Sequence, residues 1–195
     1  MPGKTNFMNI SSDDRDLNNV RLRAARIKLL LMDVDGVLTD GRLINVPTPD
    51  GSMFETKAFD SQDGIALQWL SWNGIATGVI SGRVSPATAE RARQVKMSYV
   101  YQGHIEKIPI LQEILAKSGI APEETAYAGD DLTDVVVMRR VGLAIATANA
   151  RPEVQRAAHY VTTASGGQGA IREVAELLLQ AQDRWPDILK KYEVD

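Results

Sequence analysis

Two aspartates, separated by one residue, stand where an apolar run ends. The run Leu29–Met32 leads directly into Asp33, Val34, Asp35 and Gly36. In an extended segment residues i and i+2 point to the same side, so both carboxylates can face one ligand while Val34 points into the fold. Like charges this close raise each other's pKa unless a cation lies between them. A hard divalent cation such as Mg²⁺, which prefers oxygen ligands, suits this pair.

Three further polar motifs could join this pair around one anion. Each stands at the end of a candidate strand or the start of a candidate helix: Ser81-Gly82-Arg83, Lys107 and Asp130-Asp131. Gly36 lets the backbone turn sharply, so that its N–H can approach the same anion. Taken singly, these motifs are more often ordinary turns, loops or solvated side chains. Their occurrence together indicates a phosphate site with a divalent cation.

Alternating strands and helices are required to position these groups. Apolar runs of strand length cover residues 27–32, 75–80, 98–101, 125–128, 143–147 and 160–162. Helical periodicity covers residues 64–73, 86–95, 107–118, 132–141, 152–158 and 169–182. The alternation predicts an α/β fold, with a mostly parallel Rossmann-like sheet covered by helices on both faces. In such a sheet ligands bind at the carboxyl ends of the strands.

One segment breaks the alternation. Residues 42–59 contain two short runs of strand character joined by Pro-Thr-Pro-Asp-Gly, which predicts a β-hairpin insertion. An isolated hairpin is marginal in water, so we expect it to pair with something else. The gaps between the polar motifs are too short to hold a second core, so no cap domain is expected. The site must then be open, or be closed by a neighbouring subunit.

The periodicity divides the chain into three parts. Residues 1–26 are expected to be an N-terminal extension, disordered over 1–12 and then helical from Asp13 to Arg26 with Ser12 as its cap. Residues 27–183 form the α/β domain, which carries the hairpin. Residues 184–195 are expected to be a C-terminal tail.

Composition limits the classes of partner. The net charge of −3 over 195 residues gives no general attraction to nucleic acid or anionic membranes. The chain has no cysteine, which excludes disulfides, thiol catalysis and zinc–thiolate sites. No apolar run approaches the length of a membrane span. We therefore expect a cytoplasmic protein whose basic residues are placed locally around an anionic small molecule.

These motifs resemble those of a known family. DVDGVLTDG, ISGR, Lys107 and GDDLTD are similar, in order, to the four motifs of the haloacid dehalogenase superfamily. The first motif followed by the hairpin, FDSQDG, YQG and GGQGAIRE resembles the capless 3-deoxy-D-manno-octulosonate 8-phosphate phosphatases. The resemblance covers residues 27–182. It implies an Mg²⁺-dependent homotetramer, assembled through the hairpin, that acts in lipopolysaccharide precursor biosynthesis.

The resemblance also implies a role for each motif residue. Asp33 would attack phosphorus to form an aspartyl-phosphate, and Asp35 would protonate the leaving oxygen and then activate water. Ser81 and Lys107 would hold the phosphoryl oxygens. The implied metal ligands are Asp33, the main-chain oxygen of Asp35, and Asp130. The residues implied to orient Lys107 and metal-bound water are Asp131 and Asp134.

A phosphorylated sugar acid carries a carboxylate as well as a phosphate, so further cations are expected. The resemblance assigns that task to Arg83 and Arg91. It also implies a polar wall formed by Asp60, Ser61, Asp63 and Gly64. The backbone amides of Gly36 and Gly82 are expected to be further donors to the substrate. The sequence departs from the family pattern where glutamines replace frequent arginines, at Gln62, Gln68 and Gln168.

Three alternatives remain open at this point. A phosphatase of another sugar acid, such as a nonulosonate 9-phosphate, shares the motifs, although Arg83 favours the eight-carbon acid. A receiver-like signalling domain also has a phosphorylated aspartate, but it lacks a second acid two residues later, so Asp35 argues against it. A non-catalytic scaffold with this fold is disfavoured because every motif residue is present.

Overall fold

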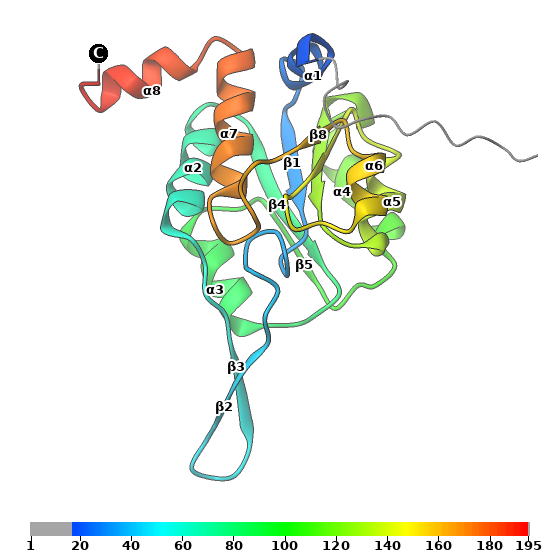
Figure 1. Cartoon of the computed structure of the whole chain (residues 1–195), viewed down its shortest axis with the longest axis vertical. Helices are drawn as coiled ribbons and strands as arrows, with labels where there is room; N and C mark the ends of the chain where they lie inside the picture. The colour runs from blue at the N-terminus through cyan, green and yellow to red at the C-terminus, as the bar shows by residue number, and fades with distance from the viewer. Residues whose placement is uncertain (1–16, 195) are drawn as a thin grey trace, which may run out of the picture.

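A six-stranded parallel sheet forms the centre of the computed structural model, which describes residues 17–194 (Figure 1). The strand order is β5-β4-β1-β6-β7-β8, and every neighbouring pair is parallel. The strands are β1 (Leu29–Met32), β4 (Ala76–Ser81), β5 (Tyr99–Gln102), β6 (Thr125–Gly129), β7 (Leu143–Ala146) and β8 (Tyr160–Val161). These bounds agree with the predicted runs to within two residues at each end.

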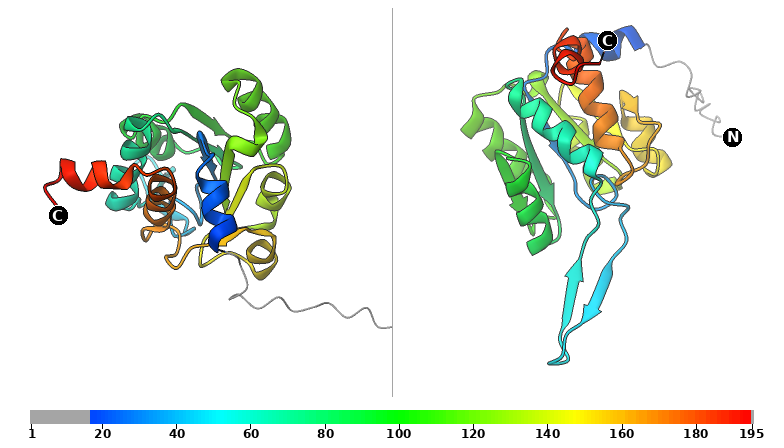
Figure 2. Two further views of the ribbon diagram at one scale, coloured as in Figure 1. Left: turned by 90° about the horizontal axis from the view of Figure 1, so that it is seen from above. Right: turned by 90° about the vertical axis from the view of Figure 1, so that its left-hand side faces the viewer.

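Helices cover both faces of the sheet (Figures 1 and 2). One face carries α1 (Leu17–Ala24), α2 (Ser61–Trp72) and α7 (Ala170–Ala181). The other carries α4 (Lys107–Ser118), α5 (Leu132–Met138) and α6 (Pro152–Ala157). The remaining helices are α3 (Pro86–Gln94), the short 3₁₀ turn η2 (Pro122–Glu124) and α8 (Trp185–Lys191). The predicted fold class is confirmed. No helix within residues 17–194 is long and apolar enough to cross a bilayer.

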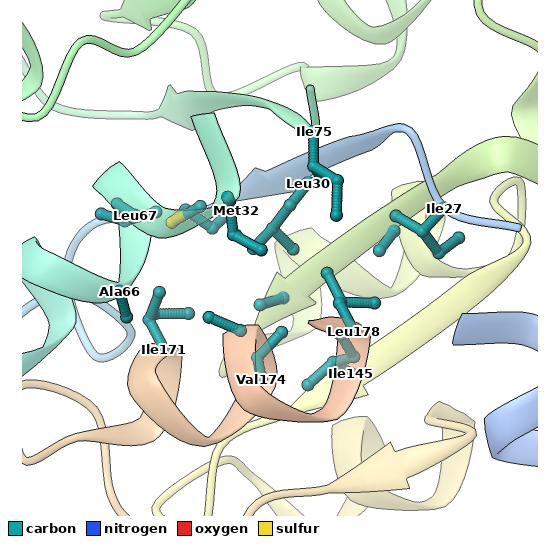
Figure 3. Close-up of a cluster of buried hydrophobic side chains, with 14 of the residues drawn as sticks. Ile27, Leu30, Met32, Ala66, Leu67, Ile75, Ile145, Ile171, Val174 and Leu178 are labelled. Atoms are coloured by element: carbon teal, nitrogen blue, oxygen red, sulfur yellow. The ribbon is translucent and has the colours of Figure 1, made fainter. Parts of the chain in front are cut away.

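The central strand β1 is apolar throughout because both of its faces are buried. Leu30 and Met32 pack into the cluster under α2 and α7, which Figure 3 shows, while Leu29 and Leu31 pack into the cluster under α4 and α5. Burying each such side chain contributes about 1.5–3 kcal/mol. The strand is therefore held firmly on both sides, and the residue that follows it, Asp33, has a well-defined position.

The strand order places a topological switch point beside β1. From β1 the chain proceeds outward to β4 and β5, and then returns across the sheet to β6 on the other side of β1. The loops after β1 and β6 therefore leave the sheet in different directions at the same carboxyl edge. Ligands bind at such positions in open α/β sheets. Asp33 follows β1, and Asp130 follows β6.

The predicted hairpin projects from the body of the domain (Figures 1 and 2). Strands β2 (Ile44–Pro47) and β3 (Met53–Thr56) pair with each other in antiparallel register and form a separate two-stranded sheet. Large apolar side chains of the hairpin are exposed: Leu43, Ile44, Val46, Met53 and Phe54. Within residues 17–194 the chain has no cap domain, as expected from the short gaps between the motifs.

The two ends of the chain were predicted to be an N-terminal extension and a C-terminal tail. Helix α1 begins at Leu17, while the predicted disorder over 1–12 and the cap at Ser12 lie outside the described residues. The segment 184–195, expected to be a tail, contains helix α8. Its Trp185 packs edge-on against Trp69, with 5.7 Å between ring centroids, and Arg172 lies over the Trp69 ring at 4.0 Å. Local periodicity could not reveal α8, because the contacts that hold it come from α2 and α7.

Candidate active site

The turn after β1 presents both aspartates of the first motif to one cavity. The Asp33 amide donates to the Ala128 carbonyl of β6 over 3.0 Å, which extends the sheet by one residue. The amides of Leu38 and Thr39 then donate to the Val34 carbonyl, at 2.9 and 3.1 Å, and close a compact turn. Val34 is fully buried, as the alternation predicts. Asp33 and Asp35 consequently face a shared cavity of about 310 Å³.

The cavity collects residues from every predicted motif. They come from the turns after β1, β4 and β6 and from the start of α4. The lining residues are Asp33, Asp35, Gly41, Ser81, Gly82, Arg83, Ile105, Lys107, Asp130, Asp131 and Thr133. The four residues assigned to catalysis and the three assigned to the metal are thus brought together. Gly41, Ile105 and Thr133 were not anticipated, since nothing in their types indicates chemistry.

Lys107 begins α4, and its ammonium group lies among acidic and phenolic oxygens. Its side chain is only 2% exposed, and Nζ lies 3.1 Å from Asp33 Oδ2 and 2.7 Å from Asp134 Oδ1. Nζ also donates to the Tyr127 hydroxyl, at 3.1 Å. Burial opposes the charged form, but Asp134 and Asp33 outweigh it and raise the pKa of Lys107. A permanent positive charge therefore lies beside the proposed nucleophile.

Asp134 fixes the geometry on the β6 side. Its Oδ1 accepts from Lys107 and from the Tyr127 hydroxyl, and its Oδ2 accepts from the amides of Asp130 and Asp131, at 3.0 and 3.1 Å. This carboxylate thus contacts Lys107 directly, and the role of orienting it, which the resemblance implies, stays a prediction. The Asp131 side chain, in contrast, accepts from the Leu132 amide at the start of α5.

Asp33 and Asp130 have the geometry and the electrostatics of a cation site. One carboxylate oxygen from each of Asp33, Asp130 and Asp134 lies within 4.8 Å of the other two. Burial, then the carboxylates of Asp134 and Asp33, raises the pKa of Asp130 to about 7. Burial also raises the pKa of Asp33 to about 6, although Lys107 opposes it. Asp130 Oδ1 is buried without a hydrogen-bond partner. A divalent cation would satisfy this oxygen and relieve the repulsion.

Gly36 lies in the turn where a side chain cannot be accommodated. Its φ is +87°, and a Cβ would stand 2.0 Å from Asp130 Oδ2. Its carbonyl accepts from Thr147 Oγ1 at 3.2 Å and from Asn149 Nδ2 at 3.0 Å. Asn149 Oδ1 in turn accepts from the Gly166 amide at 2.6 Å. Thr147 and Asn149 support the catalytic turn, and sequence reasoning missed both because neither belongs to a recognisable motif.

The loop after β4 brings the second motif to the cavity rim. Ser81 is buried, and its Oγ accepts from the Arg83 amide at 3.2 Å. The Arg83 side chain is about half exposed; it forms an ion pair with Glu55 of β3, and its Nε lies 3.8 Å from Asp35 Oδ2. Lys57, also from the hairpin, forms an ion pair with Asp35. Glu55 and Lys57 were not predicted, because they were read only as hairpin residues.

The predicted polar wall lies apart from this cavity. Asp60 caps α2, accepting from the amides of Gln62 and Asp63, and its own carbonyl accepts from Arg91 Nη2 at 2.7 Å. The Asp63 carboxylate is buried and accepts from the Arg172 amide at the start of α7, and burial raises its pKa to about 6. Neither Arg91 nor any of the four residues assigned to this wall lines the described cavity. The four are Asp60, Ser61, Asp63 and Gly64.

Sequence comparison identifies the family. A 3-deoxy-D-manno-octulosonate 8-phosphate phosphatase from Yersinia pestis is 41% identical over 86% of this chain and 87% of its own length. The chain belongs to this phosphatase family. A family model described as haloacid dehalogenase-like hydrolase also matches, over residues 85–173.

Solved structures of 3-deoxy-D-manno-octulosonate 8-phosphate phosphatases agree with this family. The enzyme from Moraxella catarrhalis, in complex with a magnesium ion, a phosphate ion and the sugar acid, superposes with a TM-score of 0.85. It is 39% identical, and the match covers 90% of this chain and 99% of that one. A cobalt-bound enzyme from Haemophilus influenzae gives 0.76 at 34% identity, covering 83% and 92%. Neither the nonulosonate nor the receiver alternative finds support among these relatives.

Proposed function

We propose that this chain is an Mg²⁺-dependent phosphomonoester hydrolase that converts 3-deoxy-D-manno-octulosonate 8-phosphate into 3-deoxy-D-manno-octulosonate and phosphate. The observation that carries this proposal is the convergence of Asp33, Asp35, Lys107 and Asp130 around one cavity. Relatives with this named activity support the substrate. The reaction would serve lipopolysaccharide precursor biosynthesis.

The proposed chemistry has two steps. In the first, an Asp33 carboxylate oxygen attacks phosphorus, the bond from phosphorus to the sugar oxygen breaks, and Asp35 gives that oxygen a proton. In the second, Asp35 takes a proton from water as the water oxygen attacks phosphorus and releases Asp33. Ser81 and Lys107 hold the phosphoryl oxygens throughout, and Lys107 offsets the negative charge that accumulates on them.

Asp33, Asp130 and the main-chain oxygen of Asp35 would hold Mg²⁺ in this proposal. The unpartnered Oδ1 of Asp130 and the raised pKa values of Asp33 and Asp130 fit such an ion. When bound, the ion supplies positive charge that keeps both carboxylates ionised and draws the phosphate into the cavity. Asp134 would not be a ligand, because both of its oxygens already accept hydrogen bonds.

Arg83 is the cation best placed for the carboxylate of the sugar acid. Its partly exposed guanidinium lies at the cavity rim, within reach of a ligand whose phosphate sits beside Asp33. A planar guanidinium can bind a carboxylate with two parallel hydrogen bonds. Arg91 donates to the Asp60 carbonyl at the start of α2 and does not line the cavity, so it contributes little to this choice. The residues Gln62, Gln68 and Gln168 add no charge.

The hairpin is the proposed means of assembly. Its exposed apolar side chains need a partner, and a second sheet edge of the same kind would bury them. We therefore include a homotetramer joined through the hairpins, and a cytoplasmic location, in the proposal. Because the domain has no cap, neighbouring subunits would also screen the cavity mouth from solvent.

The test is a phosphate-release screen with Mg²⁺ over phosphorylated sugar acids and neutral hexose phosphates. The eight-carbon acid 8-phosphate should give the highest kcat/KM, and the isosteric variant Asp33→Asn should remain folded without turnover. Activity confined to neutral hexose phosphates would overturn the substrate while sparing the reaction class. Turnover in Asp33→Asn at the wild-type rate would remove Asp33 from its role.

A further inference from the structure

Lys57 is a buried lysine that the chemistry described so far does not use. It follows β3 at the base of the hairpin, and its side chain is only 1% exposed. A lysine is almost never this buried unless its charge is paired, because removing an ammonium group from water is costly. The partners of Lys57 therefore indicate why the chain places a charge there.

Those partners belong to the acid–base half of the site. Lys57 Nζ forms an ion pair with Asp35 Oδ1 and lies 3.4 Å from Glu55 Oε1. Glu55 pairs with Arg83, whose Nε lies 3.8 Å from Asp35 Oδ2. Asp35 and these three side chains form a closed ring in which negative and positive charges alternate. Lys57 is its most buried cation, since Arg83 is 48% exposed.

Lys57 lies behind Asp35 rather than in the path of a ligand. Asp35 lines the cavity, as do Arg83 and Lys107, whereas Lys57 does not. Each aspartate of the first motif thus has its own buried lysine: Lys107 of α4 for Asp33, and Lys57 of the hairpin for Asp35. A contact from behind can fix where a carboxylate points without touching the substrate.

We propose that Lys57 is a positioning residue, supplied by the hairpin, that holds the Asp35 carboxylate where it can give a proton to the leaving sugar oxygen. This rests on the proposed function. The hairpin then has a second task besides assembly, because its inner end orients the proton donor. Thr39 Oγ1, 3.5 Å from Asp35 Oδ1, is a much weaker restraint.

The leaving group separates this role from a merely structural one. A sugar alkoxide is a poor leaving group, so cleavage of its phosphate ester depends on a well-placed proton donor. The p-nitrophenolate ion is a good leaving group and departs without a proton. Because kcat/KM reports the barrier from free enzyme and substrate to the first committed step, it isolates phosphoryl transfer to Asp33. A defect in proton donation lowers kcat/KM for the sugar ester selectively.

The experiment compares Lys57→Met with the wild type on 3-deoxy-D-manno-octulosonate 8-phosphate and on p-nitrophenyl phosphate, both with Mg²⁺. Misplacing the acid should lower kcat/KM on the sugar ester by about tenfold or more, and on the aryl ester by less than about threefold. Lys57→Arg, which keeps the charge, should restore most of the loss. Lys117→Met is the matched control, because Lys117 is an exposed lysine paired with Glu113, away from the cavity.

Each outcome is decisive. Equal losses on both esters would overturn the inference, because they would mean that Lys57 serves phosphate binding or the fold; no loss on either would overturn it as well. A wild type that hydrolyses neither ester would instead contradict the proposed function. Thermal unfolding checks that Lys57→Met is folded. If it is not, the same ratio is measured for Lys57→Gln, which keeps a hydrogen-bond donor without the charge.

Discussion

Magnesium should stabilise this protein much more at alkaline than at acidic pH. Without the ion, the folded state raises the pKa of Asp33 to about 6 and of Asp130 to about 7, from an ordinary value of 3.8. Between about pH 4 and about pH 7 the folded chain therefore holds protons that the unfolded chain has released. The free energy of unfolding must fall as pH rises through this window. Mg²⁺ binds the ionised carboxylates and restores the loss.

The magnitude follows from the shift of Asp130. A rise from 3.8 to about 7 is about 3 pKa units, or about 4 kcal/mol at 1.36 kcal/mol per unit. Asp130 is only partly buried, so solvent screening reduces this to about 1–2 kcal/mol. For a domain of this size, 1 kcal/mol shifts Tm by about 2–4 °C, which gives about 2–8 °C.

The assay is thermal unfolding at about pH 5 and about pH 8, in chelator and in saturating Mg²⁺. We expect the Mg²⁺-induced rise in Tm to be large at the higher pH and small at the lower, where protons compete with the ion. Asp130→Asn removes both the charge and the ligand. It should therefore abolish the difference between the Mg²⁺-induced rises in Tm at the two pH values. Asp63, whose pKa is raised to about 6, is unchanged in that variant, so the Tm measured in chelator should still depend on pH. An equal rise at both pH values, or none, would refute a shared ion at Asp33 and Asp130.

Three further changes test separate parts of the structure. Gly36→Ala should lower kcat about 100-fold and weaken Mg²⁺ binding in an activity titration, because its Cβ would displace the Asp130 carboxylate; normal Mg²⁺ dependence would contradict this. Tyr127→Phe should lower the free energy of unfolding by about 1–2 kcal/mol in a denaturant titration, since Asp134 loses a buried hydrogen bond; no change would mean that Lys107 compensates. Phe54→Asp should reduce the mass measured by light scattering, because Phe54 lies in the exposed apolar face of the hairpin; an unchanged mass would place the interface elsewhere.

The strand ends of the sheet were predictable because β1 and β6 are buried on both faces. Their apolar runs end abruptly at Asp33 and at Gly129-Asp130, and parallel topology brings those ends to one edge. Local sequence was thus enough to predict the position of the cavity and the motif residues that line it. The same reasoning gave the hairpin, since its turn residues and its short strands are adjacent in the chain.

The residues that sequence reasoning missed act through partners far away in the chain. The importance of Lys57 depends on its ion pair with Asp35, which forms only when the hairpin folds back onto the domain. That of Tyr127 depends on Lys107 of α4, whose ammonium group donates to its hydroxyl. The polar wall stays a prediction, and its carboxylates have partners that the sequence did not reveal. Asp60 and Asp63 have the types expected of ligands, but the backbone amides at the starts of α2 and α7 engage them.

The support of Gly36 by residues far along the chain has a consequence for how the protein folds during its synthesis. Its carbonyl is held by Thr147 and Asn149, and the Gly167 amide donates to the Val37 carbonyl at 3.1 Å. A chain emerging from the ribosome therefore exposes its nucleophile long before the segments that shape the loop around it exist. The turn that carries Asp33 therefore gains its full set of supporting hydrogen bonds only after the chain has been made as far as Gly167.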